Sequence, residues 1–399
     1  MIDLVGLTAI SLVCIITYLL AIRWPEIATI LLTAIVVRLT LIYIDHFIMP
    51  LPDTTIDAVA FETFAWRIAE NGFVNLLDYY PGFRYDFFQW LIAIPYSLFG
   101  RSVLMAKSMS LLFGIGSIFL TWKIANILWG NRIAKKAAWT VTLFPSLVLY
   151  SVIVMREVYI CFFVLVAIYG VIKWTKTNYF KYIFIALAGF LGASFFNGGM
   201  IVGAAIFLFI IFIQNLKNFY SSLLNYKINL KVVFILSFVI ISSSYVYFKE
   251  YNLPKLGILK EFNSKLLLRK TVVNVRGEAG FPEWTKVTTV SELIYKTPAR
   301  ALYFVFAPFP WNITKMSHLI GFLDSLLYMY LVFLIFSNRK VIWKDPTLRV
   351  ILIILIFYIL VFGLGVGNFG TGIRHRSKIT VLFILLAAPL LKKLVLIKK

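Results

Sequence analysis

The sequence contains few acidic residues and few charged residues of any kind. Its 399 residues include 17 Asp and Glu against 39 Lys and Arg, which gives a formal net charge of +22. Charged residues make up only 14% of the chain and hydrophobic residues 61%, whereas soluble domains are roughly half apolar. This composition excludes an ordinary soluble globule and indicates an integral membrane protein.

Cysteine and histidine are also scarce. Cys14 and Cys161 fall inside apolar runs without CxxC spacing, so we interpret both as packing residues. His46, His318 and His375 match no metal-ligand motif. No internal repeat stands out, and this disfavours a transporter built from related halves.

Long apolar runs recur along the chain. A membrane-crossing helix needs about 20 apolar residues, and we predict an all-α polytopic membrane protein of about 11 transmembrane helices in one domain, residues 1–399. The predicted spans are 4–22, 27–45, 104–128, 137–154, 158–173, 182–196, 200–214, 231–248, 319–336, 349–366 and 379–395. The first lacks a basic leader and a small-residue cleavage site, so we expect it to stay attached.

Loop charge predicts the topology. Basic loops at 130–136, 173–181, 217–231 and 338–349, and the lysines at the C-terminal end, share one side with Arg23, which we assign to the cytoplasm. Two long loops, 46–103 and 249–318, then face outward. Each contains an apolar, aromatic-rich piece too short to cross, 87–100 and 301–311, and we predict interfacial helices in both loops. Pro308 and Pro310 interrupt the second piece, which favours a segment buried against protein or lining a cavity. The basic residues are scattered through short loops, which argues against nucleic acid.

The outer side carries a second basic set that orientation does not require. Residues 251–300 hold nine Lys and Arg against four Glu, and the segment 370–378 adds Arg374, His375, Arg376 and Lys378 beside Gly370 and Gly372. Guanidinium groups bind phosphate bidentately. We therefore predict a phosphate site that draws on the following residues of the outer segments: Arg84, Arg269, Lys270, Arg276, Arg374, His375 and Arg376. Lys255, Lys260 and Lys265 fit simple headgroup contact.

Two isolated acids are the candidates for chemistry. Asp57 precedes apolar residues at helical spacing that end at Gly72, so it is either a helix-capping acid or a carboxylate aimed into a site. Arg156 and Glu157 lie between two apolar runs with almost no loop, either as a salt bridge at a tight turn or facing an aqueous cavity. Asp53 and Glu62 are the alternative acids.

Residues 30–175 resemble the GT-C membrane glycosyltransferases of family 39, the protein O-mannosyltransferase and aminoarabinose transferase type. The resemblance is carried by Arg38, Asp57, Ala65 and Gly72, Tyr96-Ser-Leu-Phe-Gly100, Trp129-Gly-Asn-Arg132, and Phe144-Pro-Ser-Leu-Val-Leu-Tyr-Ser151 with Glu157. An extra span, Leu4–Ile22, precedes the family's usual first helix and leaves the orientation of the N-terminus open. The last third resembles the family less. Pro308-Phe-Pro-Trp311 and Gly370-Thr-Gly-Ile-Arg-His-Arg376 are similar to membrane enzymes of bacterial polysaccharide clusters.

The resemblance implies an enzyme of the bacterial inner membrane that acts on its non-cytoplasmic face. It implies a polyprenyl-phosphate-linked sugar donor and a glycan, lipid or protein acceptor. Asp57 corresponds to the general base, Glu157 to a second acid and Arg84 to a donor-phosphate contact. Arg156, Arg276, Arg374, His375 and Arg376 complete the expected substrate-binding set. The sequence identifies no definite cofactor, and a divalent cation at the acids stays an open alternative.

Other functions stay open from the sequence. A repeat-unit polymerase would use lipid-linked diphosphate substrates on both sides of the reaction. A lipid or solute transporter or flippase would also place charge in a membrane cavity, but near the bilayer centre. A non-catalytic membrane subunit would tolerate Asp57→Asn.

Overall fold

The computed structural model describes residues 3–81, 86–224, 252–253, 257–258, 279–314 and 316–392. In these ranges the regular structure is helical apart from one short antiparallel pair, β1 (Asn252–Leu253) with β2 (Gly257–Ile258), and one isolated bridge between Gly280 and Asn368. The prediction of a helical protein is confirmed for this part of the chain.

Six helical segments among the described residues are long and apolar enough to cross a membrane. They are α1 (Leu4–Arg23), Pro25–Ile48 with α2 (Ala28–Tyr43) at its centre, α6 (Val103–Trp129), α9 (Glu157–Thr177), Gly198–Leu216 at the start of α11 (Ile201–Leu224), and α17 (Pro346–Gly365). These helices support a multi-pass membrane protein.

Shorter apolar helices account for most of the other predicted spans. They are α10 (Lys181–Phe196), α15 (Met316–Ser337, apolar over Gly321–Ser337) and α19 (Thr380–Ala387), which continues as the 3-10 turn η8 (Ala388–Leu390). The predicted span 231–248 lies outside the described residues. The structure therefore does not establish the expected number of about 11 crossings.

The prediction of one continuous helix over 137–154 is wrong. Helix α7 covers Asn131–Leu143, Phe144 is extended, and the one-and-a-half-turn helix α8 covers Pro145–Leu149 before an irregular turn reaches Glu157. Pro145 has no backbone N–H and disfavours helical geometry at the residue before it, so the helix ends there. The break allows residues 150–156 to form a compact turn in front of α9.

The segment 46–103, which is predicted to face outward and is called the first outer segment below, contains three short helices. They are α3 (Val59–Ala69), α4 (Phe73–Asp78) and α5 (Phe87–Phe99). The Trp90 indole donates to the Leu76 carbonyl at 2.9 Å, and Glu62 of α3 accepts from the Tyr96 hydroxyl of α5 at 3.0 Å. Gly72, with φ +87°, adopts a conformation that suits glycine just after α3, as the sequence predicts.

The segment 249–318, also predicted to face outward and called the second outer segment below, contains α14 (Val290–Phe306). The chain continues beyond α17 through α18 (Phe369–Ser377). The short helix α16 (Arg339–Lys344) joins α15 to α17. Helices at the predicted interfacial pieces are confirmed by α5 and by α14, which covers residues 301–306 of the second piece. Their position at a membrane boundary stays a prediction.

Two side-chain contacts show the relative directions of α2, α6 and α9. Lys107 at the start of α6 pairs with Asp45 after α2 (Nζ–Oδ2 2.7 Å), whereas Lys176 at the end of α9 donates to the Ile127 carbonyl near the end of α6 at 2.7 Å. Helices α2 and α6 are thus antiparallel, and α6 and α9 are parallel. The start of α9 therefore faces the same end of the helix layer as the first outer segment.

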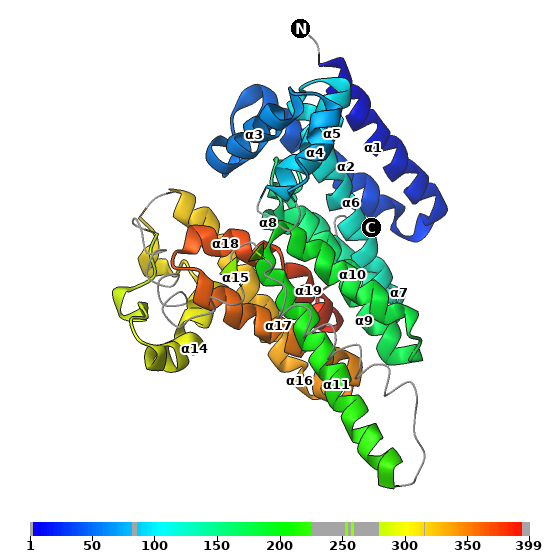
Figure 1. The fold of residues 1–399 in the computed structure, drawn as a ribbon, viewed down its shortest axis with the longest axis vertical. Helices are drawn as coiled ribbons and strands as arrows, with labels where there is room; N and C mark the ends of the chain where they lie inside the picture. The colour runs from blue at the N-terminus through cyan, green and yellow to red at the C-terminus, as the bar shows by residue number, and fades with distance from the viewer. Residues whose placement is uncertain are drawn as a thin grey trace.

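Figure 1 shows the elongated arrangement that results. The N-terminal helices α1 to α5 lie at one end of the long axis, and α11 and α16 lie at the other. Helix α18 packs against α8, α9, α14 and α15, between these ends. Residues from the first outer segment, the α8–α9 turn and α18 consequently converge.

Candidate functional site

The structure joins Asp57, Glu157 and Arg374 in one ion-pair cluster. The Arg374 guanidinium donates from Nε to Glu157 Oε1 at 2.9 Å and from Nη1 to Asp57 Oδ2. Side-chain exposure is 48% for Asp57, 17% for Arg374 and 0% for Glu157. The cluster therefore has an open end at Asp57 and a closed end at Glu157.

Helix α18 holds Arg374 in place through its N-terminus. The Asn368 side chain caps the helix by accepting from the Thr371 amide at 2.7 Å. Phe281 and Phe369 donate backbone hydrogen bonds to Gly367 and Ala279 at 2.8 and 3.0 Å. The start of α18 is therefore paired with residues 279–281 of the second outer segment.

Arg300 fixes the turn that leads into α18. Its buried guanidinium donates to the carbonyls of Gly363, Leu364, Val366 and Thr285 at 2.7–3.2 Å. The last carbonyls of α17 have no intrahelical donors, and a cation near a helix C-terminus is favourable. Arg300 was not among the predicted site residues, because nothing in its neighbourhood along the chain reveals these partners.

Glu157 is the first residue of α9, where a carboxylate is stabilised by the helix dipole. Its Oε1 lies 3.5 Å from Lys378 Nζ as well as 2.9 Å from Arg374 Nε. Among the described residues, Oε2 has no hydrogen-bond partner. Two cations of α18 and the segment after it thus neutralise a buried acid.

Lys378 is a site residue that the sequence analysis grouped with the basic set but did not select. It is buried, and its Nζ lies 2.8 Å from His375 Nδ1. His375 is buried against the Phe362 ring, with centroids 5.1 Å apart. The available signal was spacing, because Lys378 lies four residues after Arg374 and therefore near it on a helical path.

Asp57 does not cap a helix. It lies in the π-helical turn η3 (Thr54–Ala58) just before α3, and neither element has a side-chain cap hydrogen bond. Its carboxylate bonds Arg374 instead. Burial alone would lower the pKa of Arg374, but the Glu157 and Asp57 carboxylates outweigh burial and raise it above the ordinary arginine value.

Asp53 and Glu62, the alternative acids, have other partners. Asp53 accepts from the Tyr150 hydroxyl at 2.7 Å. Glu62 is buried and accepts from Arg101 at 2.7 and 3.0 Å as well as from Tyr96. Glu62 therefore connects α3 to α5 and to Arg101, two residues before α6, and Asp53 connects the first outer segment to the α8–α9 turn.

Arg156 lies beside the cluster without joining it. Its guanidinium carbon is 5.5 Å from the centre of the Phe61 ring of α3, and its Nε has no hydrogen-bond partner among the described residues. No salt bridge with Glu157 forms in this part of the chain, so the tight-turn ion pair is not observed. Burial lowers the pKa of Arg156, and the neighbouring Glu157 charge opposes that shift.

The structure separates Arg376 from Arg374. Arg376 is fully buried, donates to the Val305 carbonyl at 2.6 Å and to Ser325 Oγ at 3.2 Å, and lies 3.7 Å from Asp324. Residues two apart on an α-helix point in nearly opposite directions, so the two arginines of α18 cannot face one ligand as the sequence analysis expected. Arg84 and Arg276 lie outside the described residues, as do Arg269 and Lys270.

No group of three or more His, Cys, Asp or Glu side chains is placed to hold a metal ion within the described ranges. At the site itself, the Arg374 guanidinium lies between the two carboxylates that a divalent cation would need. With Arg374 in this position, its guanidinium occupies the space between the two carboxylates.

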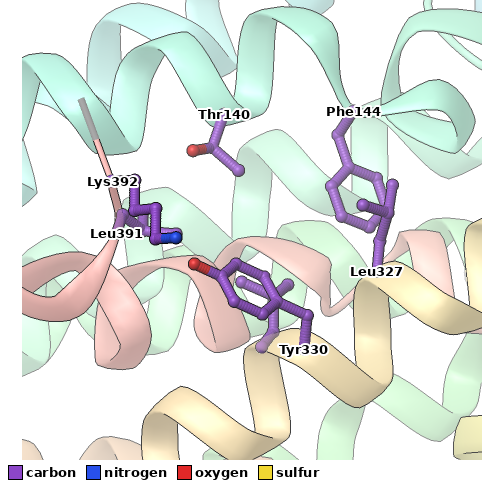
Figure 2. A pocket seen from close by; sticks show the side chains of 7 residues that line it. Thr140, Phe144, Leu327, Tyr330, Leu391 and Lys392 are labelled. Carbon is purple, nitrogen blue, oxygen red and sulfur yellow. The ribbon is translucent and has the colours of Figure 1, made fainter. Parts of the chain in front are cut away.

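A separate cavity of about 220 Å³ lies between α7, α15 and the end of the described chain. Figure 2 shows its wall, which is mostly apolar and is lined by Thr140, Phe144, Leu327, Tyr330, Leu331, Leu391 and Lys392. Helix α19 begins two residues after Lys378 and leads through η8 to Leu391. None of the lining residues belongs to the ion-pair cluster, so the cavity is not part of it.

Comparison of the chain with protein-family models, curated proteins and solved structures gives no match.

Proposed function

We propose that the chain is an integral membrane glycosyltransferase that moves a sugar from a polyprenyl-phosphate-linked donor to a glycan, lipid or protein acceptor. One observation carries the proposal. A half-exposed carboxylate, Asp57, shares Arg374 with the buried Glu157 at the start of a membrane-length helix. The arrangement offers a base and an anion-binding guanidinium side by side, at the end of the apolar helices.

The chemistry requires both groups. As the bond from the anomeric carbon to the phosphate oxygen breaks, the sugar develops positive charge and the prenyl phosphate leaves with the electron pair. The acceptor oxygen bonds to the anomeric carbon, and its proton passes to Asp57. A single displacement of this kind inverts the anomeric centre.

Arg374 has the role of receiving the leaving phosphate. Guanidinium groups bind phosphate through paired N–H donors, and the bond between Arg374 and Asp57 would exchange for one to the donor phosphate. That exchange frees the Asp57 carboxylate to act as a base. Glu157 holds Arg374 in place and balances its charge. Lys378 pairs with the same Glu157 carboxylate, and Arg156 supplies a further cation at the edge.

The proposal places the protein in a bacterial inner membrane with the site on the non-cytoplasmic side. A divalent cation is not part of the proposed reaction. The nature of the acceptor follows from the unmodified acceptor or lipid-linked intermediate that accumulates without the activity, which the experiment below measures.

The test compares Asp57→Asn with Asp78→Asn in cells that lack the native gene. Asp78 is an exposed acid of the same outer segment and ends α4 away from the cluster. Mass spectrometry of extracted lipids would follow the lipid-linked sugars. We expect Asp57→Asn to behave like the deletion, with excess monosaccharide carrier and unmodified acceptor, and Asp78→Asn to restore the product.

Other outcomes identify other functions. Accumulation of single lipid-linked repeat units would favour a polymerase that uses diphosphate-linked substrates. Unchanged lipid-linked sugars in Asp57→Asn cells, with the protein present in the membrane at normal amounts, would contradict transfer at this site. Movement of substrate without any new glycosidic bond would identify a transporter.

A further inference from the structure

Arg38 is a charged residue buried within an apolar helix. It lies near the middle of the membrane-length segment Pro25–Ile48 and is 1% exposed. Within the described ranges no acid pairs with it. Its hydrogen bonds go to Ser151 Oγ, the Thr142 carbonyl and the Ala34 carbonyl of its own helix at 2.8, 3.2 and 3.4 Å. A charge at this depth is costly, so its partners indicate its role.

Those partners lie on both sides of α8. The Thr142 carbonyl belongs to the last turn of α7, which Phe144 and Pro145 interrupt. A carbonyl at a broken helix end needs an outside donor, and Arg38 Nη1 supplies one. At the other side of α8, Ser151 Oγ accepts from Arg38 Nε and donates to the Val148 carbonyl at 2.7 Å.

Gly114 of α6 lies against the hydrogen bond between Arg38 and Ser151. A Cβ atom at Gly114 would lie 2.6 Å from the Cβ of Ser151 and 3.5 Å from Arg38 Nε. The first distance is too short for any real pair of carbon atoms. Glycine therefore permits α6 to approach the point where Arg38 meets Ser151.

The segment that Arg38 holds leads directly to the candidate site. Tyr150, next to Ser151, donates its hydroxyl proton to Asp53 at 2.7 Å, and Asp53 begins the turn that carries Asp57. Glu157 follows the same turn and is bonded to Arg374. Residues 150–157 therefore carry one carboxylate of the cluster, Glu157, and contact the turn that carries the other, Asp57.

We infer that Arg38 is a positioning residue. Arg38 stabilises the break between α7 and α8 through its hydrogen bonds to Thr142 and Ser151. This fixes Tyr150 and Glu157, which in turn position the Asp57 turn and Arg374. Arg38 does not touch the cluster itself. The effect of Arg38 on the geometry of the cluster does not depend on the proposed function. Its effect on catalysis rests on that function.

The test measures that geometry directly. Spin labels on cysteines at Thr55 and Thr371, both exposed, report the distance between the Asp57 turn and α18. Cys14 and Cys161, the two native cysteines, are first replaced by serine and alanine. Pulsed electron resonance in lipid nanodiscs then compares the full chain with Arg38→Met, Arg38→Lys and, as a matched control, Arg23→Met.

We expect one narrow distance peak in the parent and in Arg23→Met, whose arginine is exposed at the end of α1. Arg38→Met should lose that narrow peak, because neither Ser151 nor Thr142 keeps its donor. Arg38→Lys should recover it in part, since an ammonium reaches one partner but not both. If transfer is measured, activity should follow the same order.

A folded Arg38→Met protein with an unchanged peak would overturn the inference. Should Arg38→Met fail to fold, Ser151→Ala removes only the hydroxyl that joins Arg38 Nε to the Val148 carbonyl. This variant must still broaden the peak, or the inference fails. The two proposals are separable. A broadened peak in Arg38→Met, together with full product formation in Asp57→Asn, would retain the bracing role and reject the proposed transferase.

Discussion

Arg374 donates from Nε to Glu157 Oε1 at 2.9 Å, although 217 positions separate the two residues in the chain. The acceptor is completely buried and the donor is mostly buried. The pair closes the inner end of the cluster, and the same guanidinium reaches outward to the half-exposed Asp57. One side chain of α18 therefore connects a buried structural acid to an accessible one.

Glu157→Gln should destabilise the protein. The change keeps the volume of the side chain but leaves Arg374 and Lys378 without their buried counter-charge, which typically costs about 3–5 kcal/mol. Thermal unfolding in detergent measures the loss, with the exposed acid substitution Glu26→Gln as the control. Equal melting temperatures for the two variants would show that the buried carboxylate does not stabilise the fold.

Arg374→Lys should remove the proposed activity while largely preserving the fold. Lysine keeps the charge and can pair with Glu157, but its single ammonium cannot also reach the position of the Asp57 carboxylate or of the phosphate that replaces it. Loss of one preorganised donor to the leaving group typically lowers kcat by about 100-fold or more. Arg339→Lys, at an exposed position of α16, is the matched control for product formation. A transfer rate near that of the parent would remove Arg374 from the mechanism.

Asp45 and Lys107 should behave as a coupled pair. Their ion pair spans 2.7 Å with both side chains buried, and Asp45 Oδ1 also accepts from the Leu51 amide and the Thr54 hydroxyl. Asp45→Asn or Lys107→Met alone should each lower unfolding free energy by about 3–5 kcal/mol. The double variant should lose clearly less than the sum of the two, measured as a double-mutant cycle by reversible unfolding in mixed micelles. Simple additivity would mean that the contact has no energetic weight.

Arg300→Met should loosen the turn between α17 and α18. Four carbonyls lose a charged donor, and each buried acceptor left unsatisfied costs about 1–3 kcal/mol before relaxation. Amide hydrogen exchange of residues 363–372 should rise locally. Arg300→Lys should show a smaller increase, because lysine can reach some of the same carbonyls. Exchange that stays at parent levels would show that Arg300 is dispensable there.

Much of the helical architecture follows from the sequence. The apolar runs at 4–22, 104–128 and 349–366 form α1, α6 and α17 within a few residues of the predicted limits. The spacing that predicted a helix after Asp57 and its stop at Gly72 is also confirmed by α3. Hydrophobic periodicity and glycine geometry are local properties, so a sequence is sufficient to predict them.

The break inside 137–154 was accessible in principle, because Pro145 is visible in the sequence. The apolar residues on both sides of Pro145 nevertheless form one run of membrane-crossing length, and a run of that kind predicts a single helix. The consequence of the break is not local. The Thr142 carbonyl in the last turn of α7 accepts a hydrogen bond from Arg38, which lies more than a hundred positions earlier in the chain.

Partners of charged side chains were harder to predict than helices. The sequence placed Asp57, Glu157 and Arg374 among the candidates, but it also grouped Arg374 with Arg376 and left a salt bridge between Arg156 and Glu157 open. In the structure Arg376 turns to Asp324 and Val305, and Arg156 turns to Phe61. Neighbours in sequence on a helix point in different directions, so adjacency does not predict partnership.

The amino-acid sequence by itself determined that this chain is a helical protein with several membrane-length apolar helices, because the cost of leaving backbone and apolar groups unsatisfied acts on each segment separately. Only the tertiary structure decided that Arg374 lies between Asp57 and Glu157, that Lys378 joins them, and that Arg38 braces the turn behind them. Electrostatic partnership depends on distances between helices, and packing sets those distances.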